Sequence, residues 1–104
     1  MENFGLSEKH LKTINEIFSK YTGIQKVLVY GSRAMGTYRP GSDIDMTIIG
    51  DISTRELFKI INDFDDSMLP YLTDISIFSK LKNPGLIEHI NTFGKVIYPQ
   101  DCIN

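Results

Sequence analysis

Apolar residues recur every three or four positions in three segments of the chain, residues 7–21, 53–67 and 83–94. This spacing places them on one side of a helix, so the pattern predicts a helix in each segment. Local signals agree, because Ser7 can cap the first helix and Ser53 opens the second with a capping box. The positions predicted to be buried are Leu11, Ile14, Ile17 and Phe18, then Leu57, Phe58, Ile60, Ile61 and Phe64, and finally Leu86, Ile87, Ile90 and Phe93.

Four shorter segments, residues 25–30, 43–49, 72–78 and 95–98, have the apolar and β-branched composition of strands. Helical and extended segments alternate without repeats or a linker, so we expect a single domain over residues 1–104. The predicted fold class is α/β or α+β, with a mixed β-sheet and helices packed mainly on one face.

Composition narrows the classes of function. The chain has 104 residues, of which 41% are apolar and 23% charged, and its net charge is −2. Its basic residues are scattered, which argues against a domain that binds nucleic acid. No apolar run reaches the roughly 20 residues of a membrane span, and the first residues lack the pattern of a secretory leader. The single cysteine, Cys102, cannot form an internal disulfide, so we expect a cytoplasmic protein.

Two carboxylates mark the start of the second predicted strand. Asp43 and Asp45 are two positions apart, so a strand would place both on one face and turn Ile44 into the core. Such a pair is unfavourable unless a cation lies between the two groups, and oxygen ligands select Mg²⁺ or Mn²⁺. Gly31 and Ser32 follow the preceding strand and offer an anion a close backbone approach, a hydroxyl and an N–H. The stretch therefore predicts a nucleotide site.

A third carboxylate interrupts the apolar segment 72–78. Asp74 is costly there unless it is paired or binds a ligand. If its strand neighbours the strand of Asp43 and Asp45, the three acids can surround the same ions. The alternative is an aspartate on the solvated face of an edge strand.

The GS of residues 31–32 and the DID of residues 43–45 resemble the GS…DxD motif of the polymerase-β-type nucleotidyltransferase superfamily. The surrounding GSRAMG and GSDIDM resemble in particular the minimal nucleotidyltransferase family, short proteins often paired with a HEPN partner in toxin–antitoxin modules. The resemblance extends over about residues 27–98. It implies a nucleotidyltransferase-like fold with the site on the open face of a mixed sheet. It also implies two Mg²⁺ ions, or Mn²⁺, and ATP or another nucleoside triphosphate as donor.

The implied reaction is an in-line displacement at the α-phosphorus of the triphosphate. Asp43 and Asp45 would bridge the ions, and Asp74 would complete one ion shell and could accept the proton of the attacking hydroxyl. Arg33 and Arg39 could neutralise developing charge, or could simply be solvated loop arginines. The candidate nucleotide-binding residues are Gly31, Ser32, Arg33, Arg39 and Ser42.

The acceptor hydroxyl is expected on another molecule, because the chain lacks the acceptor-positioning domain of larger relatives. The resemblance suggests a tyrosine of a HEPN-type toxin that is silenced by AMP, which would make this protein an antitoxin. Two alternatives stay open: a non-catalytic antitoxin or binding subunit, and transfer to a small hydroxylated molecule such as an aminoglycoside. The preferred base and the oligomeric state, with itself or with another protein, also stay open.

The two histidines carry no predicted role. His10 and His89 lie in predicted helices without a partner at metal-ligand spacing, so both are predicted to be surface residues. Glu88 beside His89 could form an acid–base pair, but its helix is expected to be remote from the aspartates.

Overall fold

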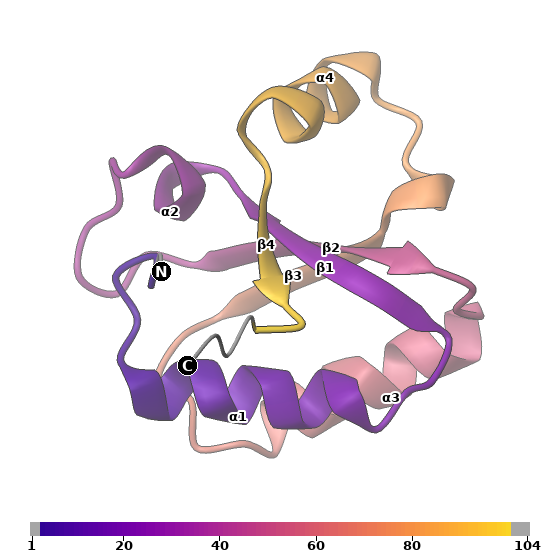
Figure 1. Ribbon diagram of the computed structural model, residues 1–104, viewed down its shortest axis with the longest axis horizontal. Helices are drawn as coiled ribbons and strands as arrows, with labels where there is room; N and C mark the ends of the chain where they lie inside the picture. The colour runs from indigo at the N-terminus through magenta and orange to yellow at the C-terminus, as the bar shows by residue number, and fades with distance from the viewer. Residues whose placement is uncertain (1–2, 101–104) are drawn as a thin grey trace.

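One mixed sheet of four strands organises the computed structural model, which describes residues 3–100 (Figure 1). Cys102 lies outside the described residues. In chain order the elements are α1 (Glu8–Ser19), β1 (Ile24–Tyr30), α2 (Ser32–Met35), β2 (Ile44–Gly50), α3 (Thr54–Asp65), β3 (Thr73–Ile77), the short 3₁₀ helix η1 (Phe78–Lys80), α4 (Pro84–Phe93) and β4 (Lys95–Tyr98).

The strand order is β3-β2-β1-β4. Strand β1 pairs antiparallel with both β2 and β4, whereas β2 and β3 are parallel. A parallel pair needs a long crossover connection, and α3 supplies it between β2 and β3. The predicted mixed sheet is confirmed, and β3 and β4 are its edge strands.

The helices divide between the two sides of the sheet. In Figure 1, α1 and α3 run side by side below the strands, and α2 and α4 lie above them. Ile44, Met46 and Ile48 of β2 are fully buried in the same core cluster as Ile14 of α1 and Ile60 of α3. Because side chains alternate along a strand, the residues between these three point to the opposite face, where α2 and α4 lie.

Capping signals set the helix ends where the sequence predicts them. The hydroxyl of Ser7 accepts a hydrogen bond from the His10 N–H at the start of α1. At the start of α3, Ser53 Oγ accepts from the Glu56 N–H while Glu56 Oε1 accepts from the Ser53 N–H, so the capping box is complete.

Two positions predicted to be buried are exposed instead. Phe58 of α3 is 61% exposed, because the inward side of this helix is the narrower stripe of Leu57, Ile60, Ile61 and Phe64. Phe58 lies about 60° around the helix from Ile61, the nearest edge of that stripe. Phe93, in the last position of α4, is 41% exposed, and Ile90 is the buried residue of that helix. Within residues 3–100, none of the helices has both the length and the apolar character that crossing a bilayer requires.

Candidate active site

Two carboxylates, those of Asp45 and Asp74, lie side by side on the face of the sheet that α2 and α4 flank. In the parallel pairing of β2 and β3, Asp45 lies directly beside Asp74, and in the antiparallel pairing of β1 and β2 it lies directly beside Tyr30. Paired positions share a face, so Tyr30, Asp45 and Asp74 form a row across three strands. Asp43 precedes β2 by one residue, and Ile44 is fully buried, as the alternation predicts.

The surroundings of Asp45 disfavour its charged form. Burial raises the pKa of Asp45, and the carboxylates of Asp74 and Asp43 raise it further. Among the described residues that act on this pKa, His89 is the one that lowers it. Burial also raises the pKa of the Tyr30 hydroxyl, with Asp74 and Asp45 adding to the effect.

The donor set fits a hard divalent cation. Carboxylate oxygens are ligands for Mg²⁺ and Mn²⁺. Burial and the neighbouring carboxylates of Asp74 and Asp43 raise the pKa of Asp45, so a cation beside it would favour its charged form. Within residues 3–100, no group of three or more His, Cys, Asp or Glu side chains is arranged tightly enough to hold a metal ion on its own. Mg²⁺ usually binds through one or two carboxylates together with substrate phosphates, so Asp43, Asp45 and Asp74 are suited to an ion that arrives with a nucleotide.

The Gly31–Ser32 turn lies against this row. Gly31 has φ +74° and ψ −151°, a conformation essentially restricted to glycine. A Cβ added to Gly31 would lie 2.6 Å from Asp45 Oδ2, so the backbone passes close to the carboxylate. Helix α2 begins at once with Ser32, and the Met35 N–H donates to the Gly31 carbonyl at 3.1 Å. The structure therefore brings both halves of the predicted site together.

The prediction that His89 is a surface residue on a remote helix is wrong. The Gly31 N–H donates to His89 Nε2 at 3.0 Å, and the ring packs edge-on against Tyr30 with centroids 6.1 Å apart. The other histidine is not a simple surface residue either, since His10 is half-buried and packs edge-on against Tyr71.

The position of His89 follows from the pairing of the last strand, which the sequence pattern alone does not give. The helix of His89 leads into the closing strand, which pairs with β1 so that Lys95 lies beside Val29. This pairing carries the end of α4 toward the end of β1, and hence toward Gly31.

Arg33 is buried beside the α2–β2 loop. Its side chain is 3% exposed, and Nε and a terminal guanidinium nitrogen donate to the Ser42 carbonyl at 3.2 and 2.8 Å. The other terminal nitrogen donates to the Phe4 carbonyl at 2.9 Å, and the rings of Tyr38 and Tyr71 lie 5.3 and 4.8 Å from the guanidinium carbon. These contacts tie the α2–β2 loop to the N-terminal segment and explain why the charge is buried.

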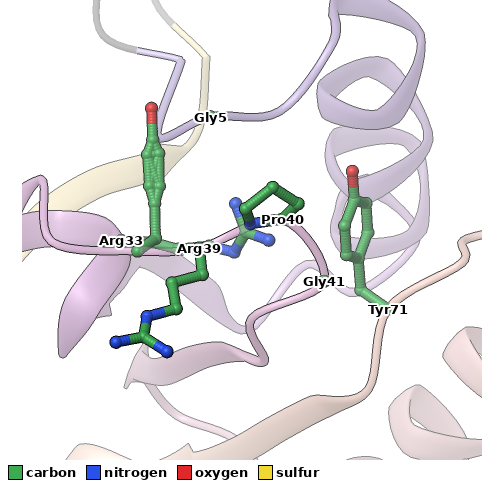
Figure 2. A pocket seen from close by; sticks show the side chains of 7 residues that line it. Gly5, Arg33, Arg39, Pro40, Gly41 and Tyr71 are labelled. Carbon is green, nitrogen blue, oxygen red and sulfur yellow. The ribbon is translucent and has the colours of Figure 1, made fainter.

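Arg39 and Ser42 form the turn that closes the same loop. The Arg39 N–H donates to Ser42 Oγ, and the Ser42 N–H donates to the Arg39 carbonyl, at 2.8 and 2.9 Å. Pro40 and Gly41 suit the two central positions of a type II turn, because Gly41 has the positive φ, +83°, that the second of these positions requires. Figure 2 shows the pocket of about 430 Å³ beside this turn, lined by Gly5, Arg33, Tyr38, Arg39, Pro40, Gly41 and Tyr71. The three predicted nucleotide-binding residues Arg33, Arg39 and Ser42 thus gather around the loop, and none of the three aspartates lines this pocket.

A mixed sheet that carries strand carboxylates beside a glycine–serine turn is the arrangement of a nucleotidyltransferase. The chain belongs to the polymerase β nucleotidyltransferase family, because the family model described as "Polymerase beta, Nucleotidyltransferase" matches residues 12–102. It is therefore a nucleotidyltransferase enzyme, as the motif resemblance implies.

The similar proteins agree with this assignment. The Methanocaldococcus jannaschii protein named "Putative protein adenylyltransferase MJ0604" is 30% identical over 97 residues, which cover 88% of this chain and 97% of that protein. The crystal structure of a toxin–antitoxin with AMP-PNP matches with a TM-score of 0.69 at 18% identity, over 86% of this chain and 73% of that one. The structure of the toxin–antitoxin MntA-HepT matches with a TM-score of 0.65 at 14% identity, over 90% and 74%. The structural matches show the shared fold.

Proposed function

We propose that this protein transfers AMP from ATP, with Mg²⁺, to a tyrosine hydroxyl of a HEPN-type partner protein and so acts as the antitoxin of a two-protein module. The observation that carries the proposal is the register of β2 and β3, which lays Asp74 beside Asp45 next to the Gly31–Ser32 turn. The proposal is supported by a relative named as a protein adenylyltransferase and by structural neighbours that are toxin–antitoxin complexes.

The residues divide the reaction between them. The Gly31–Ser32 turn would bind the β- and γ-phosphates through a backbone N–H and the serine hydroxyl. Asp43, Asp45 and Asp74 would hold the divalent ions, which supply Lewis acidity at the reacting phosphoryl group when they are bound. The acceptor oxygen then forms a bond to the α-phosphorus while the bond to pyrophosphate breaks, and Asp74 takes the hydroxyl proton.

Exposure indicates the side from which the acceptor arrives. Asp74 is exposed on the edge strand β3, whereas Asp45 is half-buried between β3 and β1. A protein side chain can therefore reach Asp74 from solvent without opening the sheet. This arrangement suits an acceptor that belongs to a second macromolecule.

The test is a mass measurement on the partner. The purified chain is mixed with Mg-ATP and a HEPN-family protein encoded beside it, and intact masses are recorded over time. We expect the partner to gain the mass of AMP on a tyrosine, Asp45→Asn to abolish the gain, and Asp65→Asn, an exposed acid of α3, to leave it unchanged. If ATP binds and the partner is inhibited in the complex without any mass gain, the protein is a non-catalytic binding subunit. If a small hydroxylated molecule gains AMP in its place, the acceptor class is wrong.

A further inference from the structure

The short helix α2 lacks a cap of its own. Its N-cap residue is Gly31, which has no side chain, and its third helical residue is Ala34, which cannot accept a hydrogen bond. Helix α3 shows what is missing, because there the third helical residue, Glu56, accepts from the N–H of the cap residue Ser53. In α2 this N–H would be unpaired if it relied on its own helix.

His89 supplies the missing acceptor from another helix. Its Nε2 accepts the Gly31 N–H across 58 positions of sequence. An accepting Nε2 is unprotonated, so the imidazole proton of the neutral ring is on Nδ1. The ring is held between Tyr30 and Phe93, whose centroids lie 6.1 and 5.2 Å from its own, and the neighbouring Ile90 anchors α4 in the interior. The acceptor therefore has a fixed position.

The hydrogen bond acts where the backbone is least restrained. Gly31 has no Cβ, so its φ and ψ are less restricted than those of the other residues of the turn. A change of these angles would turn the Gly31 carbonyl away from the Met35 N–H, with which it forms the first bond of α2, and would move Ser32. The hydrogen bond to His89 fixes the Gly31 N–H on one side of these two angles and so opposes that change.

We propose that His89 is a positioning residue of the nucleotide site: it binds the Gly31 N–H from the α4 side and holds the Gly31–Ser32 turn in the shape that receives the triphosphate. The inference rests on the proposed nucleotide site at this turn. His89 binds the Gly31 N–H and leaves the N–H and hydroxyl of Ser32 to the phosphates. In this role α4 belongs to the site although it provides no carboxylate.

Two substitutions at one position separate this role from simple packing. His89→Leu fills a similar volume with an apolar side chain but removes the hydrogen-bond acceptor. In His89→Gln the amide oxygen can accept a hydrogen bond from the Gly31 N–H. Glu88→Gln, an exposed neighbour on the same helix, is the matched control. Binding of AMP-PNP with Mg²⁺ is measured by calorimetry well below each variant's thermal midpoint, and exchange of the Gly31 amide is measured by NMR without nucleotide.

We expect His89→Leu to weaken AMP-PNP binding about five- to tenfold and to speed Gly31 amide exchange, as the loss of one hydrogen bond predicts. His89→Gln should restore both values to within about twofold, and Glu88→Gln should match the parent. A His89→Leu variant that binds as tightly as the parent, or more tightly, overturns the inference, and so does a glutamine variant as weak as the leucine one. If the parent itself does not bind AMP-PNP while its Gly31 amide is protected by His89, the proposed nucleotide site is what fails, and the positioning role fails with it.

Discussion

An alanine at position 31 would press one methyl group against the carboxylate of Asp45. The added Cβ would lie 2.6 Å from Asp45 Oδ2, well inside normal contact distance. The backbone conformation, φ +74° and ψ −151°, is also one that alanine avoids. Gly31→Ala therefore carries two penalties, one for the backbone and one for the overlap.

The magnitudes of the two penalties are similar. A residue with a side chain in this region of backbone space costs about 1–3 kcal/mol. Overpacking costs about 1–3 kcal/mol more, and the half-buried Asp45 can relieve part of it by rotating. We expect Gly31→Ala to lower the free energy of unfolding by about 2–4 kcal/mol, which corresponds to roughly 10–20 °C in thermal midpoint for a domain of this size.

The assay is urea unfolding of the metal-free protein, with Gly36→Ala as the matched control. Gly36 also has a positive φ, of +80°, but its Cβ would meet nothing within 4 Å, so its cost should be about 1 kcal/mol from the backbone alone. In an Asp45→Ala background the overlap disappears, and Gly31→Ala should cost about 1–3 kcal/mol less there than in the parent. The reasoning is refuted if Gly31→Ala costs no more than Gly36→Ala, or if removing the Asp45 carboxylate leaves its cost unchanged.

Three further outcomes follow from the charges and the buried polar groups. The fold raises the pKa of Asp45, so this carboxyl contributes stability below its unfolded pKa of about 3.9 that is lost as the pH rises through the folded value. Metal-free Asp45→Asn should therefore be at least as stable as the parent at pH 7, with the difference vanishing near pH 3, and a less stable variant at pH 7 would mark Asp45 as a structural residue. Arg33→Lys should lose about 2–4 kcal/mol of unfolding free energy, because it removes the guanidinium that bonds the carbonyls of Phe4 and Ser42 together. The exposed Arg39→Lys should lose less than about 0.5 kcal/mol, and equal losses in the two variants would contradict the buried role of Arg33. The Tyr21 hydroxyl donates to Asp63 at 2.6 Å, and burial and this bond raise its pKa to about 12. Tyr21→Phe should therefore lower the free energy of unfolding by about 1 kcal/mol at pH 7, and by progressively less as the pH rises from about 10 to 12. A loss that does not change with pH would refute this.

Local signals were sufficient to predict most of the elements. The capping serines and the spacing of apolar residues depend on neighbours within one or two turns, and the observed helices begin where those signals predict. The juxtaposition of Asp74 with Asp45 could be anticipated for a related reason. An aspartate within an apolar strand must point to the face that is not the core, and two neighbouring strands that each carry one must present both on that face.

The supporting residues could not be predicted in this way. His89 reaches Gly31 through a single hydrogen bond between segments 58 positions apart, and nothing in the pattern around either residue encodes that contact. Arg33 is a similar case, because a loop arginine looks solvated until the carbonyls of Phe4 and Ser42 and the rings beside it are placed in space. For Phe58 the prediction was wrong in the opposite sense, because this residue was predicted to be buried and is exposed. An apolar residue at the border of a stripe can point to either side.

The most direct test of the shared carboxylate site is the rate of AMP transfer by Asp74→Asn under single-turnover conditions, with ATP binding measured on the same sample. Asp74 and Asp45 come from separate segments and meet only through the register of the sheet. We predict that the variant still binds ATP and transfers AMP about 10²- to 10⁴-fold more slowly than the parent, as expected for the loss of a group that accepts the acceptor's proton. An Asp74→Asn variant that transfers AMP at the parent's rate would contradict the account.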